Sequence, residues 1–174
     1  MTFELARPEN AQAIVRMRNE SSADLTRKLG QGHWSGTSRI QSVKERIGLG
    51  DPENLRHNTL YVACNDAGVV GSVVVSTFPP GFWKRTYWSE PSAAGLGVFH
   101  LVVPPPLQRQ GIGRFLMEGV ESLARGHGIP FVRLDAYAAN PFSTEFYRRI
   151  GYIERSEIDV RGVRLVLFEK RVVA

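Results

Sequence analysis

The sequence predicts an α/β fold in which about seven strands and four helices form a single domain over residues 1–174. Three observations favour this fold. Two blocks, residues 99–127 and 131–152, each read as a strand, a turn and an amphipathic helix. Further upstream, two β-rich runs flank Asn65-Asp66-Ala67-Gly68, which is a strong hairpin signal. A chain of 174 residues is also long enough to bury one substantial core.

Local patterns set the expected bounds of each element. Strands are expected where β-branched and aromatic residues alternate or run together: residues 3–6, 59–64, 69–76, 99–103, 131–137, 152–158 and 163–172. Helices are expected where apolar residues recur every three or four positions: residues 11–21, 38–47, 112–126 and 141–150. Residues 21–37 and 78–85 show neither pattern and are expected to be irregular.

The segment from Gln108 to Gly113 predicts an anion-binding site. It follows an apolar strand and three prolines, and it leads into an amphipathic helix. The first N–H groups of a helix lack internal partners and carry the positive end of the helix dipole. Glycines at 111 and 113 let a ligand approach the backbone closely, while Arg109 and Arg114 add positive charge. We therefore expect a ligand that carries phosphate groups.

Three phosphate-binding patterns compete for this segment. A Walker A loop requires Gly-Lys-Ser/Thr, but Gly113 is followed by Arg114 and Phe115. A dinucleotide fingerprint requires a third glycine where Leu116 stands, although Asp135 lies at a suitable distance and keeps an NAD-binding oxidoreductase open. The third pattern, Gln/Arg-x-x-Gly-x-Gly/Ala, fits with both glycines in place.

The second block adds a matching signature. Asn140-Pro141 is a turn that can open a helix, and Gly151 is a helix stop. The run from Asn140 through Phe146-Tyr147 to Gly151-Tyr152 fits the pattern Asn…Leu-Tyr-x-x-x-Gly-Phe. Together, the two blocks resemble the acetyl-CoA loop and the downstream signature of the GNAT superfamily of N-acetyltransferases.

This resemblance implies a fold and a cofactor. The fold is a central, mixed, mostly antiparallel sheet with flanking helices, in which the fourth and fifth strands part at one end. The pantetheine arm of acetyl-CoA is expected in that gap, between residues 101–103 and 134–136. The residues implied for cofactor binding are Leu101, Val102, Val103, Gln108, Arg109, Gln110, Gly111, Ile112, Gly113, Arg114, Asn140 and Phe142.

The implied reaction moves an acetyl group to a primary amine by direct attack through a tetrahedral intermediate. The amine must lose a proton, the carbonyl must be polarised, and the leaving thiolate gains a proton. Tyr147 matches the family tyrosine that would protonate the thiolate, and its alternative role is to line the pocket. Cys64 lies in an apolar strand and is expected to be a packed thiol, which favours direct transfer over a covalent intermediate.

The general base is less defined. His100 is the only titratable side chain within the fourth strand, and its ordinary pKa of about 6.5 suits the role. Strict alternation would place it on one face with Leu96 and Val98, which favours a buried core histidine. Glu90, Asp135 and a chain of water molecules remain open as alternatives.

The acceptor is expected to be a small-molecule or peptide amine. In this fold it would meet the first helices, residues 21–37 and residues 78–88. These segments carry several aromatic side chains, of which Trp34 and Trp83 are the proposed substrate-binding residues. Packing on the core is an equally weighted alternative for both tryptophans.

Composition and local patterns limit the partners, the location and the metals that are expected for this chain. The net charge is +5, but basic residues are spread along the chain without a nucleic-acid motif. No apolar run is long enough for a membrane helix, no secretory signal is recognised, and one cysteine fits a reducing cytoplasm. No metal-ligand spacing is found. A non-catalytic acyl-CoA sensor also fits the loop, and a homodimer is left open.

Overall fold

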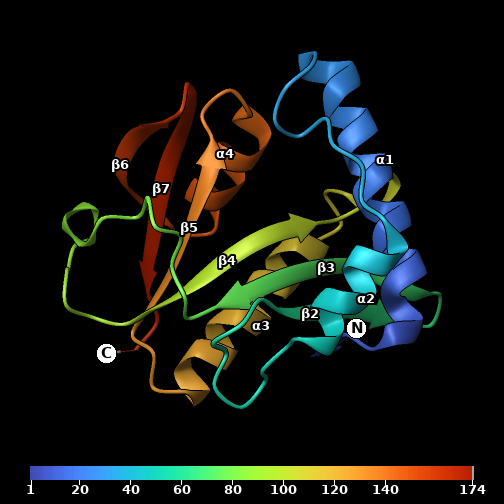
Figure 1. Cartoon of the computed structure of the whole chain (residues 1–174), viewed down its shortest axis with the longest axis horizontal. Coiled ribbons are helices and arrows are strands. Elements are labelled where there is room, and N and C mark those ends of the chain that lie inside the picture. Colours follow the sequence, from blue (N-terminus) through green and yellow to red (C-terminus); the bar gives the residue numbers. More distant parts are fainter. Residues whose placement is uncertain (174) are drawn as a thin grey trace. The chain divides into compact units, whose positions relative to one another are not determined.

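The computed structural model describes residues 1–173, and its seven strands form one mixed sheet in the order β1-β2-β3-β4-β5-β7-β6. The predicted α/β class and strand number are confirmed (Figure 1). The strands are β1 (Thr2–Leu5), β2 (Thr59–Asn65), β3 (Gly68–Ser76), β4 (Gly95–Val102), β5 (Phe131–Tyr137), β6 (Ile153–Val160) and β7 (Val163–Arg171). The helices are α1 (Ala11–Leu29), α2 (Ile40–Gly48), α3 (Ile112–Gly126) and α4 (Pro141–Arg149).

The chain divides into two compact units, each of which has its own interior. The first comprises Met1–Val75 and His100–Gly119, and the second comprises Ser76–Phe99 and the residues from Val120 onward. The division falls inside both β4 and α3. The single domain expected from the sequence stays a prediction.

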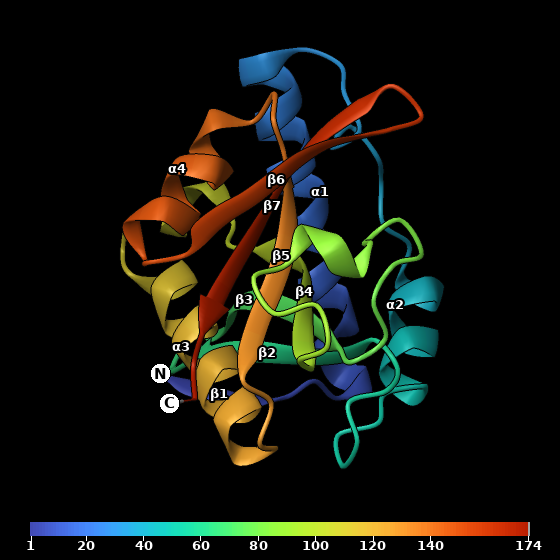
Figure 2. The same ribbon diagram turned by 90° about the vertical axis from the view of Figure 1, so that its left-hand side faces the viewer.

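In the first unit, β1, β2 and β3 form an antiparallel ladder. The predicted hairpin is confirmed, because the Asn65 side chain accepts a hydrogen bond from Ala67 N at 2.9 Å and Gly68 has a φ of 105°. Helices α1 and α2 lie on one face of these strands, and the start of α3 lies on the other (Figures 1 and 2). That start packs closely, because a Cβ on Gly119 would lie 2.5 Å from the Phe3 ring.

In the second unit, the start of β4 runs parallel to β5, and β5 pairs with β7 in antiparallel register. The β4–β5 ladder ends at Val98 and Leu134, although both strands continue. Pairing between β4 and β5 therefore stops before either strand ends, and the gap expected between the fourth and fifth strands stays a prediction. Trp83, Trp88 and Leu167 form a hydrophobic cluster in this unit.

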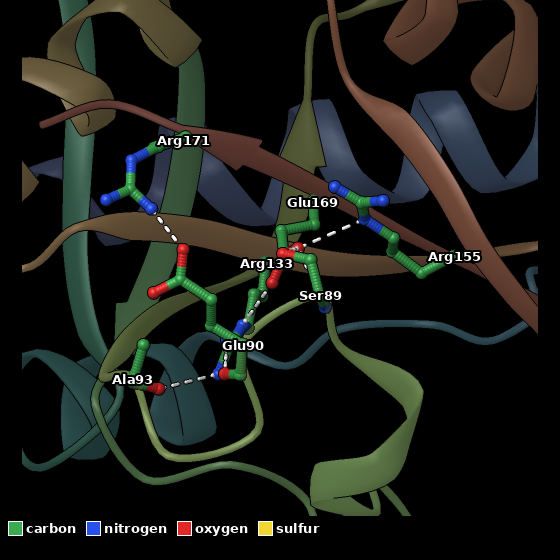
Figure 3. Close-up of polar contacts among 7 residues, drawn as sticks. All are labelled: Ser89, Glu90, Ala93, Arg133, Arg155, Glu169 and Arg171. Carbon is green, nitrogen blue, oxygen red and sulfur yellow. Dashed lines mark hydrogen bonds and ion pairs between the residues drawn. The ribbon is translucent and has the colours of Figure 1, made fainter. Parts of the chain in front are cut away.

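The second unit also contains a buried ionic network that organises an irregular segment. Figure 3 shows the Glu169 carboxylate on β7 between Arg133 and Arg155, with Ser89 beside it. Arg133 Nε donates to Glu169 Oε2 at 2.8 Å, and Arg155 Nε donates to Glu169 Oε1 at 3.1 Å. The Arg133 guanidinium also donates to the backbone carbonyls of Glu90 and Ala93, at 3.0 Å each. The network thus fixes residues 89–93 against the strands.

Two predicted bounds were wrong for local reasons. Helix α1 continues to Leu29, eight residues past the predicted end at 21, because polar side chains rather than an apolar stripe support its last turns. Asp24 pairs with Lys28 one turn later, and Thr26 Oγ1 donates to Ser22 O at 2.8 Å. Strand β4 begins at Gly95 instead of 99, where the sequence offers two glycines rather than a β-rich run.

Candidate functional site

The predicted phosphate-binding loop lies exposed at the start of α3. Residues 108–111 are exposed, and Arg109 and Gly111 adopt positive φ values of 63° and 85°. The Gln108 side chain donates to Val103 O at 3.0 Å, and the Gln110 side chain donates to Pro106 O at 3.1 Å. These two bonds hold the loop in place while its backbone faces solvent.

The geometry of this loop fits an anion. The first α3 hydrogen bond runs from Phe115 N to Gly111 O at 2.9 Å, so the preceding helical N–H groups have no intrahelical partner. A Cβ placed on Gly111 would meet no atom within 4 Å, which leaves open space above the backbone. Ile112 is buried under the loop, Gly113 is half-buried, and Arg114 is exposed. The loop can therefore bind phosphate groups through backbone N–H donors and nearby arginines.

The end of β4 lies beside the loop and beside α1 in the same unit. Leu101, Val102 and Val103 are half-buried. Besides Gln108, the Ser21 hydroxyl of α1 donates to Val103 O at 3.4 Å. Pantetheine binding by this strand end stays a prediction.

His100 does not occupy the position that strict alternation predicts. Its φ of 48° breaks the alternation of β4, so His100 is exposed while Leu96 and Val98 are buried. The expectation of a buried core histidine was therefore wrong. Surrounding protein still lowers the pKa of the imidazole to about 4, and the positive charges of Arg18 and Arg46 lower it further in the same direction. His100 is thus neutral at physiological pH and can accept a hydrogen bond or a proton.

Arg18 is a residue that the sequence analysis did not single out. It lies on α1, and burial together with the charge of Arg46 lowers the pKa of its guanidinium to about 10. One sequence signal could have drawn attention to it. Arg18 follows the buried Ile14 by four residues and the buried Met17 by one, so it borders the apolar stripe of its helix.

Tyr147 lies in the second unit, on α4, with an exposed fraction of 7%. Its ring packs against Phe146, Tyr152 and Phe168. Within residues 1–173, its hydroxyl makes no hydrogen bond to another residue. Burial, with a smaller contribution from the charge of Asp135, raises the pKa of this phenol well above its ordinary value. Tyr147 therefore keeps its proton and has it available for a bound group.

Tyr152 provides a contrast within the same motif. Its hydroxyl donates to Glu121 Oε1 at 3.2 Å, and Lys170 Nζ also contacts this carboxylate, at 2.8 Å and 3.0 Å from its two oxygens. Tyr152 thus has a structural hydrogen bond, which Tyr147 lacks.

The other two residues predicted to bind the cofactor near α4, Asn140 and Phe142, differ in their contacts and in their exposure. Asn140 is the N-cap, and its side-chain oxygen accepts a hydrogen bond from Ser143 N at 3.4 Å. This confirms its capping role and leaves cofactor binding as a prediction. Phe142 is half exposed, at 50%, because the buried face of α4 is centred on Thr144 and Tyr147.

The two proposed substrate-binding tryptophans also differ. Trp83 is buried, with an exposed fraction of 6%, and its Nε1 donates to Asp135 Oδ2 at 2.9 Å. This placement favours the packing role that the sequence left open. Trp34 is half-buried, and its Nε1 donates to Gly30 O at 3.1 Å, which closes the turn after α1.

The remaining candidates for proton transfer or nucleophilic attack are engaged or unreactive. Glu90 forms an ion pair with Arg171, and burial raises the pKa of Asp135 although the Trp83 hydrogen bond opposes this. Burial, followed by a hydrogen bond with Glu4 and its charge, raises the pKa of the Cys64 thiol to about 11. A protonated thiol is a poor nucleophile.

Within residues 1–173, no helix combines the length and the hydropathy required to cross a membrane. The same residues contain no group of three or more His, Cys, Asp or Glu side chains that could hold a metal ion.

Solved structures share this fold along almost the whole chain. The ribosomal-protein-alanine N-acetyltransferase of Brucella melitensis matches 98% of this chain and 99% of its own, with a TM-score of 0.72 and 15% identity. The structure of yncA from Salmonella typhimurium with its cofactor acetyl-CoA matches 99% of this chain and 94% of its own, with a TM-score of 0.68 and 16% identity.

Sequence comparisons identify the family. The N-acetyltransferase YesJ of Bacillus subtilis (strain 168), itself uncharacterised, is 27% identical over 172 residues, which cover 95% of this chain and 87% of YesJ. The S-(2-succino)cysteine N-acetyltransferase of the same organism is 24% identical over 122 residues, which cover 68% of this chain and 69% of that enzyme. The model of the acetyltransferase (GNAT) family matches residues 15–152. The chain therefore belongs to the GNAT acetyltransferase family and is an acetyl-CoA-dependent acyltransferase.

Proposed function

We propose that this chain transfers the acetyl group of acetyl-CoA to the primary amine of a small-molecule acceptor by direct attack on the thioester. The observation that carries the proposal is Tyr147, whose side chain is buried and whose hydroxyl keeps its proton and has no hydrogen-bond partner among residues 1–173. The similarity of this chain to one relative supports a small acceptor, because that relative is named for the acetylation of a cysteine derivative.

The proposed reaction has three steps. The ammonium form of the acceptor first loses a proton, because only the free amine has a lone pair. The amine nitrogen then attacks the thioester carbonyl and forms a tetrahedral intermediate, in which the former carbonyl oxygen carries the negative charge. Finally, the C–S bond breaks and the proton of Tyr147 passes to the departing sulfur. The nitrogen, which became positively charged on attack, releases its second proton to solvent as the amide forms. Tyr147 regains a proton from solvent.

We propose His100 as the group that receives the amine proton, directly or through water. Its exposed, neutral imidazole has a free lone pair at neutral pH. A pKa of about 4 makes it a weak base for an amine, so the proton is passed on rather than retained. The protonated thiol of Cys64 supports direct transfer, because a covalent acetyl-enzyme would require a nucleophile.

The cofactor is proposed to lie with its phosphates on residues 108–114. The exposed backbone of this loop, the open space above Gly111 and the charges of Arg109 and Arg114 support this placement. Backbone groups of residues 101–103 are the proposed contacts of the pantetheine arm.

The test is a screen that detects the free thiol of CoA after incubation with acetyl-CoA and a panel of primary amines. The panel contains free amino acids, S-substituted cysteines, polyamines and short peptides, and mass spectrometry confirms the acetylated product. We expect turnover of at least one amino-acid-sized amine. Acetyl-CoA binding by the folded protein without turnover of any small amine would contradict the proposal.

A further inference from the structure

Arg18 has an unusual environment for a charged side chain. Its Nε and Nη2 atoms are buried, and neither has a hydrogen-bond partner among residues 1–173. Buried polar atoms are nearly always hydrogen-bonded, and a buried charge without a partner is costly to the folded state. The structure therefore contains two strong donors that lack an acceptor.

The two unpartnered atoms lie on one edge of the guanidinium group. Nε–H and Nη2–H point in parallel from the same side of this planar group, so together they can donate to the two oxygens of one carboxylate. A single water molecule or carbonyl group offers only one oxygen, so it would satisfy these two N–H donors less completely than a carboxylate does. The chemistry of the unsatisfied pair thus points to a planar, bidentate anion.

The charged side chain that acts on Arg18 is another base, Arg46, rather than an acid. Arg46 on α2 acts on Arg18 by charge repulsion, and both arginines act in the same way on His100 of β4. Helices α1 and α2 pack against each other. One turn after Arg18, Ser21 donates to Val103 O at 3.4 Å, which fixes this part of α1 beside the end of β4. Arg18 of α1, Arg46 of α2 and His100 of β4 therefore belong to one unit and lie close enough to interact electrostatically.

We propose that Arg18, together with Arg46 and His100, binds a carboxylate of the amine acceptor. The inference rests on the proposed transfer of acetyl to a small amine, and it assigns a substrate class to that reaction: amines that carry a carboxylate, such as amino acids. The phosphates of acetyl-CoA are the other source of anions, but residues 108–114 already provide a separate site with its own arginines.

The first experiment tests the anion site without catalysis. Binding of succinate to the protein is measured by calorimetry in the absence of cofactor, with succinamide as the uncharged probe. We expect succinate to bind and succinamide not to bind, and Arg18→Gln to weaken succinate binding at least about 10-fold. The matched control is Arg16→Gln, because Arg16 lies on the same helix with 69% of its side chain exposed. Unchanged affinity in Arg18→Gln would overturn the inference.

The second experiment compares acceptors in matched pairs, amino acids against their primary amides, at saturating acetyl-CoA. We expect the wild-type protein to prefer the carboxylate by about 10- to 100-fold in kcat/KM, and Arg18→Gln to reduce this preference to within about 3-fold. The dissociation constant of acetyl-CoA should be unchanged in Arg18→Gln. If instead acetyl-CoA binding weakens while the preference persists, Arg18 serves the cofactor and the inference is wrong.

A stability measurement separates a binding role from a structural one. If Arg18 serves to bind a ligand and does not stabilise the unliganded fold, Arg18→Met should raise the Tm of the protein in the absence of ligand. The reason is that this substitution removes an unpaired buried charge. A lower Tm would indicate a structural arginine and count against the inference. The outcomes also distinguish the two proposals. Succinate binding without turnover of any amine would refute the proposed function alone, whereas turnover without a carboxylate preference would refute this inference alone.

Discussion

Arg133 Nε lies 2.8 Å from Glu169 Oε2, and the Glu169 side chain is completely buried. The two residues sit opposite each other on adjacent strands β5 and β7. Ser89 and Arg155 complete the set of donors around the carboxylate (Figure 3). Because Arg133 also holds the backbone carbonyls of Glu90 and Ala93, this pair connects the sheet with the irregular segment before β4.

Replacement of one partner of this pair should destabilise the protein strongly. Arg133→Met leaves Glu169 buried with fewer donors, and removal of one member of a buried ion pair costs about 3–5 kcal/mol. Chemical denaturation should show this loss as a lower free energy of unfolding. Arg148→Met is the matched control, because the Arg148–Glu154 ion pair is largely exposed and should contribute less than about 1 kcal/mol. Equal losses in both variants would contradict the prediction.

The same carboxylate predicts a specific pH dependence of stability. Burial alone would raise the pKa of Glu169, but hydrogen bonds from Ser89 and Arg133 and the charge of Arg133 lower it below the ordinary 4.5. The unfolded chain therefore takes up this proton first as the pH falls, so the contribution of Glu169 is full above pH 4.5 and declines below it. The difference in unfolding free energy between the wild type and Glu169→Gln should shrink below that pH. A difference that stays constant with pH would contradict this assignment.

Gly111 allows a test of the phosphate loop that separates ligand binding from backbone strain. Gly111→Glu should weaken acetyl-CoA binding by about 100-fold or more, because a carboxylate about 4 Å from a phosphate costs about 4 kcal/mol near a protein surface. Gly128→Glu is the control: both glycines have positive φ, at 85° and 66°, and a Cβ on either meets open space. The strain of about 1–2 kcal/mol is therefore common to both variants. Calorimetry should detect weaker acetyl-CoA binding only in Gly111→Glu; similar losses in both would remove the loop assignment.

Local pattern was sufficient for strand β5 and for the start of helix α3. Strand β5 spans Phe131–Tyr137 as predicted, because it is a β-rich run with clear turn signals on both sides. Helix α3 begins at Ile112 as predicted, because the apolar period of the helix starts there after the glycine-bearing loop. In both cases the deciding interactions are close in sequence.

The parts that sequence reasoning missed depend on tertiary contacts or on unusual backbone angles. The orientation of His100 depends on a positive φ in a residue other than glycine, and no local pattern encodes this. Arg18 becomes notable only because folding brings it near Arg46 and His100, which come from distant segments. For Trp83 the sequence left substrate binding and packing open, and only the tertiary structure shows that it is buried and bonded to Asp135.

The titration of His100 should report on the charges around it. The pKa of its imidazole is lowered to about 4, first by desolvation from the surrounding protein and then by the charges of Arg18 and Arg46, so NMR should show a neutral ring throughout the range from pH 5.5 to 7.5. Arg18→Gln removes one repelling charge and should shift the pKa of His100 upward, toward 6.5. An ordinary His100 pKa in the wild type, or no shift in the variant, would contradict this arrangement.

Tyr147 and Tyr152 form a matched pair that tests the acid role. Tyr147→Phe removes a hydroxyl that has no hydrogen-bond partner among residues 1–173, so stability should change little. If this hydroxyl protonates the leaving thiolate, kcat should fall by about 100-fold or more while acetyl-CoA affinity stays within about 3-fold. Tyr152→Phe removes the hydrogen bond to Glu121 instead, so it should cost about 1 kcal/mol of stability and leave kcat nearly unchanged. Steady-state kinetics and thermal unfolding of both variants measure these effects. If Tyr147→Phe retains wild-type kcat, the tyrosine only lines the pocket and another group protonates the thiolate.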